Sequence, residues 1–301
     1  MSELDPPPDS PNAPEEGSAA TPASPPGETL SAAEVTPEQP HGPRREYAED
    51  IRTPWGWGQL LLFLVVAFGC LFLVTTTMSA ILIFGYHMSI AEVRTYATTS
   101  ARFNSLGMAI VYVLLIGYLY LTIHSRNYPA FWRTIGWRHL SVPRIPRAAL
   151  YPLLAVCGMA LAVLVQLGAL AFPTKHNLPM EALFHSRTGI LWLMAVGILL
   201  APAVEETVFR GYLYPVMARS FGIEWGVVVT GTLFGLMHAH QLWGGWGQIG
   251  LLIFVGIVLT YVRARSGSVV ASWLIHVGYN TFLFAGFFIS TGGLRHLPPV
   301  N

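Results

Sequence analysis

Charged residues are scarce in this chain. Of its 301 residues only 11% are charged, whereas 53% are hydrophobic, and the mean hydropathy is +0.50. An ordinary soluble domain carries about 25% charged residues. The scarcity therefore argues against a soluble protein and predicts an all-α fold, a bundle of about seven or eight helices that crosses a membrane repeatedly.

Cysteines and basic tracts are also few. Cys70 and Cys157 both lie in apolar runs, which argues against a disulfide framework or a cysteine metal cluster. The formal net charge is +1, and no run of lysine or arginine is typical of an arm that binds nucleic acid. We therefore expect the lipid bilayer to be a partner and nucleic acid not to be one.

The first fifty residues contain almost no aliphatic run and are rich in Pro, Glu, Ser and Ala. Such a composition cannot bury a core, so residues 1–50 are predicted to form a disordered tail. The stretch lacks a basic region followed directly by an apolar one, so it does not have the pattern of a cleavable signal peptide. We interpret it as a solvated extension, and a role in binding is the alternative.

Apolar runs follow one another beyond the tail. We predict helices at about 58–85, 103–123, 148–172, 189–218, 225–240, 248–264 and 268–290. The run at 225–240 is short for a full crossing, so a tilted or partly re-entrant helix is an alternative there. We interpret residues 86–102 as a loop, and an eighth membrane segment is the alternative.

Lysines and arginines in short loops indicate the orientation. With seven crossings and a cytoplasmic N-terminus, most of them fall inside: Arg44, Arg45, Arg52, Arg126, Arg133, Arg138, Arg144, Arg147, Arg263 and Arg265. The outer loops hold Arg94, Arg102, Lys175, Arg187 and Arg295. This bias predicts an integral membrane protein with a cytoplasmic N-terminus and an external C-terminus. Trp55, Trp57, Trp243 and Trp246 are typical of anchors at the membrane interface.

Three polar clusters interrupt the last apolar runs. They are Glu205-Glu206-x-x-x-Arg210, Phe234-x-x-x-His238 and His276-x-x-x-Asn280. A charge inside a membrane costs roughly 2.5–3.5 kcal/mol on insertion scales, so it is kept where it pairs internally or faces a polar cavity. At 1.5 Å per residue, the clusters lie about equally deep, roughly 18 Å from the predicted inner helix ends. They are therefore expected to meet in one layer and form a functional site.

The spacing within each cluster suggests how its members interact. Glu206 and Arg210 are four residues apart, so the guanidinium can neutralise that carboxylate within one helix. Glu205 points about 100° away and is expected to remain free. His276 and Asn280 share a helix face. By the same spacing, Phe234 places an apolar surface under the imidazole of the second cluster.

A free carboxylate and two imidazoles in a low-dielectric cavity suit the deprotonation of a water. Alternatively, Glu205, His238 and His276 would hold Zn²⁺ or another divalent metal and leave a position open for water. Asn280 is a neutral donor suited to an oxyanion. The structural interpretations are that Glu206–Arg210 is an internal bridge and that each histidine only bonds between helices.

The three motifs, in this order on successive late helices, resemble the CAAX-protease and bacteriocin-processing family. That family contains the type II CAAX prenyl endopeptidases. The resemblance covers about residues 189–290, which would be the catalytic core, preceded by transmembrane helices over 51–188 and followed by a tail over 291–301. The usual soluble zinc-protease pattern, His-Glu-x-x-His, is absent from the sequence.

The resemblance implies a role for each motif residue. Glu205 and His238 would activate the attacking water, and His276 and Asn280 would bind the oxyanion or complete a metal site. Supporting roles would fall to Glu206, Arg210 and Phe234. The implied activity is that of an intramembrane endopeptidase acting on a membrane-associated protein or peptide, including prenylated proteins of the CAAX type. The alternatives are a non-catalytic membrane scaffold or immunity-type protein on the same fold, and, less favoured, a transporter.

Overall fold

The computed structural model describes residues 49–124, 130–173 and 178–297. Some predictions fall outside that part, namely the tail over residues 1–48, the last residues 298–301, and the loop residues Arg126 and Lys175. The described residues are helical and contain no strand beyond one isolated bridge between Val142 and Ile145. The predicted all-α fold is therefore confirmed.

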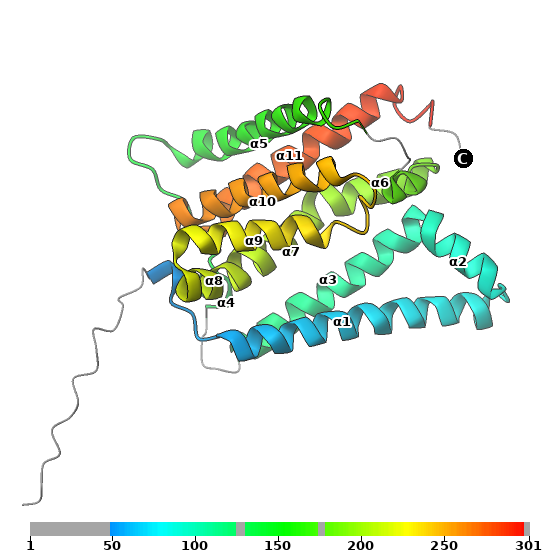
Figure 1. Ribbon diagram of the computed structural model, residues 1–301, viewed down its shortest axis with the longest axis horizontal. Coiled ribbons are helices and arrows are strands. Elements are labelled where there is room, and N and C mark those ends of the chain that lie inside the picture. Colours follow the sequence, from blue (N-terminus) through cyan, green and yellow to red (C-terminus); the bar gives the residue numbers. More distant parts are fainter. Residues whose placement is uncertain (1–48, 125–129, 174–177, 298–301) are drawn as a thin grey trace, which may run out of the picture. The chain divides into compact units, whose positions relative to one another are not determined.

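Seven apolar helical stretches run through the described part (Figure 1). Six are long and apolar enough to span a membrane: Trp57–Gly85 (α1 and η2), Ala101–His124 (α3), Arg147–Ala169 (α5), Arg187–Phe221 (α6 to α8), Trp246–Ser266 (α10) and Val269–Ser290 (α11). The seventh, α9 (Ile223–Met237), is apolar but only 15 residues long. At 1.5 Å per residue it spans about 22 Å, against a bilayer core of about 30 Å. Each of the seven predicted helices is present.

The stretch interpreted as a loop, residues 86–102, instead contains a helix, α2 (Ile90–Thr99). Its N-terminus has a reciprocal capping box: the Ser89 hydroxyl accepts from the Glu92 backbone N–H, and the Glu92 carboxylate accepts the Ser89 backbone N–H at 2.7 Å. The hydrogen bonds donated by the Ser89 backbone and hydroxyl hold the pKa of the Glu92 carboxyl below its ordinary value. Ten residues cannot cross a bilayer, so α2 is not an eighth span.

Helix pairs pack closely where glycines face a neighbouring backbone. In Figure 1, α5 and α11 run side by side, as do α9 and α10. A Cβ atom at Gly158 would lie 1.9 Å from the Ile275 carbonyl oxygen, and one at Gly278 would lie 2.0 Å from the Ala155 carbonyl oxygen. The two helix axes can therefore approach only because both positions lack a side chain, which agrees with the small-residue packing common in membranes.

One end of the bundle collects several of the basic residues. Arg219 on α8 donates to the backbone oxygens of Ile51 at 3.2 Å and Thr53 at 3.0 Å. The backbone N–H of Val269 donates to the Gly136 carbonyl at 2.8 Å, which joins the segment after α4 (Phe131–Thr134) to α11. These contacts bring the segments before α1, after α4 and between α10 and α11 together at the same end.

Two interpretations of this end were wrong. Arg263, taken as a loop charge, lies in the last turn of α10, is fully buried, and pairs with Asp50 at 2.9 Å. Trp55, taken as an interfacial anchor, is only 4% exposed, stacks on Tyr212 with ring centroids 5.0 Å apart, and donates from Nε1 to its carbonyl. Both residues bond to segments distant in sequence, which their local sequence did not indicate.

Candidate active site

The first motif lies in a long helical stretch that is interrupted twice by π-helical turns. These are η4 (Val196–Leu200) and η5 (Thr207–Leu213), which flank α7 (Ala201–Glu206). Each π segment is followed two residues later by a proline, Pro202 or Pro215. A proline donates no N–H to the preceding turn and its ring crowds that turn, which favours a locally wider helix. The motif therefore occupies a distorted stretch, as π turns at functional sites commonly do.

Glu206 and Arg210 form a fully buried ion pair. Arg210 Nη1 donates to Glu206 Oε1 at 2.8 Å, as their four-residue spacing predicted. The remaining donors of the guanidinium reach α10, from Nη2 to the Gly256 carbonyl at 2.9 Å and from Nε to the Thr260 hydroxyl at 3.2 Å. Its carbon also lies 4.4 Å from the ring centroid of Phe234. One arginine thus joins the motif helix to α9 and α10.

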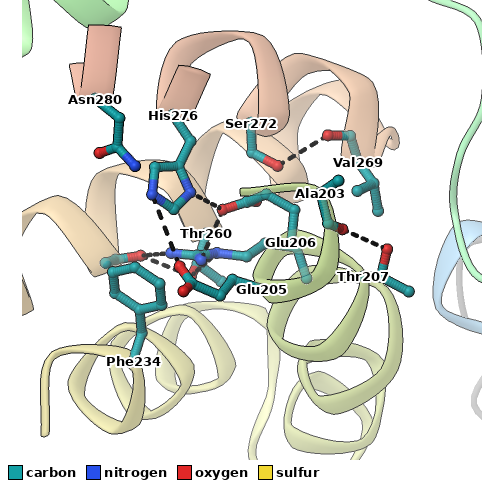
Figure 2. Close-up of polar contacts among 12 residues, drawn as sticks. Ala203, Glu205, Glu206, Thr207, Phe234, Thr260, Val269, Ser272, His276 and Asn280 are labelled. Carbon is teal, nitrogen blue, oxygen red and sulfur yellow. Dashed lines mark hydrogen bonds and ion pairs between the residues drawn. The ribbon is translucent and has the colours of Figure 1, made fainter. Parts of the chain in front are cut away.

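His276 on α11 lies between the two glutamates (Figure 2). Its Nδ1 lies 3.0 Å from Glu206 Oε1, and because a carboxylate only accepts, Nδ1 carries the proton. Its Nε2 lies 3.8 Å from Glu205 Oε2, which is too far for a direct hydrogen bond. Glu206 therefore sets the tautomer of the imidazole and turns its second nitrogen towards Glu205.

Glu205 is not free, contrary to the prediction. Its Oε1 accepts a hydrogen bond of 2.8 Å from the hydroxyl of Tyr112 on α3. The glutamate side chain is almost fully buried, and the tyrosine is half-buried. Sequence reasoning missed Tyr112 because a tyrosine in an apolar helix, one of three on α3 and far from any motif, carries no spacing signal.

The second motif is arranged around the ring of Phe234. This ring lies 4.9 Å from the His238 ring and 5.7 Å from the His276 ring, between centroids. His238 is the C-cap of α9, and its Nδ1 lies 2.9 Å from the Phe234 carbonyl oxygen. Since a carbonyl only accepts, Nδ1 donates, and in the neutral ring Nε2 is left as an acceptor. The apolar surface predicted under the His238 imidazole is present.

Asn280 faces η4. Its Nδ2 donates to the Gly197 carbonyl at 2.7 Å, so one of its two amide hydrogens is engaged with the backbone. The predicted oxyanion donor therefore also ties α11 to the distorted helix. The three motifs, predicted to meet in one layer, are joined by contacts through Glu206, His276 and Phe234.

An apolar cavity of about 600 Å³ adjoins this layer. One wall is a face of the motif stretch, and the others come from α3, the segment around α4, and the start of α11. Its lining residues are Tyr112, Val113, Ile116, Trp132, Trp137, His139, Leu200, Ala203, Val204, Thr207 and Val270. Trp137 Nε1 donates to the Thr207 hydroxyl at 2.9 Å, which ties this wall to the motif. Tyr112 belongs to both the cavity wall and the polar layer.

The residues proposed for a metal do not form a ligand group in this structure. Among the described residues, no three of His, Cys, Asp and Glu are arranged to hold an ion. His238 and His276 each use Nδ1 for another contact, with a carbonyl and with Glu206. A divalent metal held by Glu205, His238 and His276 stays a prediction.

Comparisons with known proteins agree with the motifs. Residues 187–282 match the family described as type II CAAX prenyl endopeptidase Rce1-like. An uncharacterized 24.3 kDa protein of Escherichia coli is 30% identical over 187 residues, which cover 60% of this chain and 77% of that protein. No solved structure matches significantly.

The chain is therefore an integral membrane protein of a protease family. It belongs to the CAAX-protease and bacteriocin-processing family, with its Rce1-like region over α6 to α11.

Proposed function

We propose that this protein is an intramembrane endopeptidase in which Glu205 activates a water to hydrolyse a peptide bond of a membrane-associated substrate. The observation that carries the proposal is the separation of 3.8 Å between Glu205 Oε2 and His276 Nε2 in a buried site. With Nδ1 protonated, a neutral His276 presents Nε2 as an acceptor, so both atoms accept. One water within about 2.8 Å of each can donate to both, and its lone pairs then remain available for attack.

The reaction then follows from these roles. The water oxygen attacks the scissile carbonyl carbon while Glu205 takes its proton, which yields a tetrahedral intermediate with a negative oxygen. When the C–N bond breaks, the protonated carboxyl returns that proton to the leaving amine. Neutral donors such as the second amide hydrogen of Asn280 suit the oxyanion.

The two histidines need separate tests. The family resemblance pairs Glu205 with His238 for water activation, whereas the histidine beside Glu205 in this structure is His276. His238 packs its ring against the Phe234 ring, and in the neutral form its Nε2 is available as an acceptor. We propose that one of the two shares the water with the glutamate and that the other serves the oxyanion in its protonated form, in which Nε2 donates.

We propose as substrates membrane-associated proteins of the CAAX type, including prenylated ones. The family match supports this class. The apolar cavity beside Tyr112 also supports it, since a hydrocarbon chain requires an apolar, concave surface. The proposed location is a bacterial plasma membrane, with the basic end of the bundle in the cytoplasm.

The decisive experiment measures cleavage of fluorogenic CAAX-type peptides, with and without a prenyl group, by purified protein in lipid nanodiscs. We expect Glu205→Gln to lower kcat by about 10²–10⁴-fold, because general-base catalysis contributes about that much. The matched control is Glu224→Gln, an exposed carboxylate in the first turn of α9, which should retain wild-type activity. His238→Ala and His276→Ala are compared in parallel.

Wild-type cleavage by Glu205→Gln would contradict the proposal. If the wild-type protein cleaves no peptide, complementation of a null strain decides: a scaffold keeps its function with Glu205→Gln, and a protease loses it. A chelator arm tests the metal. Unchanged turnover favours water activated by the glutamate alone, whereas loss of turnover that added Zn²⁺ restores would indicate a metal site.

A further inference from the structure

One hydrogen bond joins the polar layer to α3, a helix outside the region that matches the family. The Tyr112 hydroxyl lies 2.8 Å from Glu205 Oε1 although the two residues are 93 positions apart. Because an ionised carboxylate only accepts, the hydroxyl is the donor. Tyr112 therefore holds one oxygen of the proposed base, while the other oxygen, Oε2, faces His276 Nε2.

The terminal torsion of a glutamate is broad, so a carboxylate without a partner samples many orientations. The bond from Tyr112 selects the orientation in which Oε2 points at the imidazole of His276. We propose that Tyr112 is a positioning residue that acts through Glu205 and holds its second oxygen ready for the attacking water. This inference rests on the proposed function.

The same tyrosine also borders the apolar cavity beside Val113 and Ile116 of its own helix. One face of the motif stretch lines the cavity, at three- and four-residue spacing, with Leu200, Ala203, Val204 and Thr207. Glu205 directly follows Val204 and points about 100° away from it around the helix. Tyr112 thus belongs to both: the residue lines the cavity, and its hydroxyl donates to the carboxylate of Glu205. A substrate chain in the cavity would contact the residue that orients the base.

These two roles can be separated by mutation. Tyr112→Phe keeps the ring in the wall and removes only the hydroxyl. We expect kcat to fall by about 10- to 100-fold, the range for a lost hydrogen bond to a charged group, with KM changed less than twofold. Ile116→Ala alters the wall alone and should raise KM with little change in kcat. The matched control is Tyr118→Phe, the same change on α3 at a ring that packs 6.1 Å from Phe63.

A second measurement does not need a substrate. The infrared difference spectrum between wild type and Tyr112→Phe should contain a change in the carboxylate stretching region. That change should vanish when the same pair is compared in a Glu205→Gln background. Tyr118→Phe should produce no such change. A tyrosine that only packs would leave the carboxylate band unmoved.

The outcomes distinguish this inference from the proposed function. The positioning role would be overturned by a wild-type kcat in Tyr112→Phe, or by the absence of a carboxylate change that depends on Glu205. If Glu205→Gln is inactive at the same time, the proposed protease function is still supported. Full activity of Glu205→Gln would overturn the proposed function, and the positioning role with it. A fall in kcat together with a Glu205-dependent infrared change supports the inference.

Discussion

At the scale of residues, a single carboxylate oxygen organises the polar layer. Glu206 Oε1 accepts from both Arg210 and His276, and neither Glu206 nor Arg210 has any exposed surface. A buried ion pair adds little net stability, because desolvation offsets the attraction, but removal of one partner leaves an unpaired buried charge. Arg210 therefore acts first on the stability of the fold, by neutralising Glu206, and supports the site through that pair.

We expect Arg210→Ala to lower the free energy of unfolding by about 3–5 kcal/mol, because it leaves Glu206 unpaired in the bundle. Arg265→Ala is the matched control, since Arg265 is exposed near the end of α10. Denaturant titration in micelles followed by circular dichroism measures both. Equal stability of the two variants would show that Glu206 is satisfied without the guanidinium.

At the scale of elements, prolines and glycines shape the helices that carry the site. Pro202 and Pro215 follow the two π segments, and the wider turns flank the glutamates. The glycine contacts between α5 and α11 set how closely α11 packs, and α11 carries His276 and Asn280 into the layer. Site geometry thus depends on helix packing outside the motifs.

Gly278→Ala should destabilise the protein by about 1–3 kcal/mol, the usual range for overpacking, because its Cβ would overlap the Ala155 carbonyl. Gly286→Ala on the same helix meets no atom within 4 Å and should be neutral or slightly stabilising. Thermal unfolding of the two purified variants in one detergent makes the comparison. A Gly278→Ala variant as stable as Gly286→Ala would mean that α5 and α11 do not pack so closely.

At the scale of the whole molecule, seven stretches place the short helix η1 (Glu49–Ile51) and the end of α11 at opposite ends of the bundle (Figure 1). The segments around Arg219, Arg138 and Arg263 meet at the end where η1 lies. Basic residues favour the cytoplasmic side, so we propose that this end is cytoplasmic. The short helix α9 decides whether the number of membrane crossings is odd or even. If α9 did not cross, α10 and α11 would run through the membrane in the opposite directions.

Cysteine labelling tests this orientation. In a variant with Cys70 and Cys157 replaced by alanine, we introduce Gln241→Cys after α9 or Arg265→Cys near the end of α10, both at exposed positions. A membrane-impermeant maleimide should label the first in intact cells and the second only after permeabilisation. Labelling of the second but not the first in intact cells would mean the opposite orientation.

Much of this arrangement was accessible from sequence because it is periodic or local. Apolar runs, six of them of membrane length, predicted the seven helices, and the spacing of four predicted the Glu206–Arg210 pair and the contact of Phe234 with His238. The helix α2 was missed because the helices were predicted from apolar runs, whereas its sequence signal was a Ser89–Glu92 capping box in a polar stretch.

The sequence by itself determined the class of fold, the order of the helices, and the contacts between residues one helical turn apart, since hydrophobic length and helical spacing are properties of single segments. Only the tertiary structure decided the contacts that cross between helices. Tyr112 holds Glu205, Asp50 neutralises Arg263, and His276 lies between both glutamates. Such pairs depend on how closely helices pack and rotate against one another, and no spacing along the chain encodes that directly.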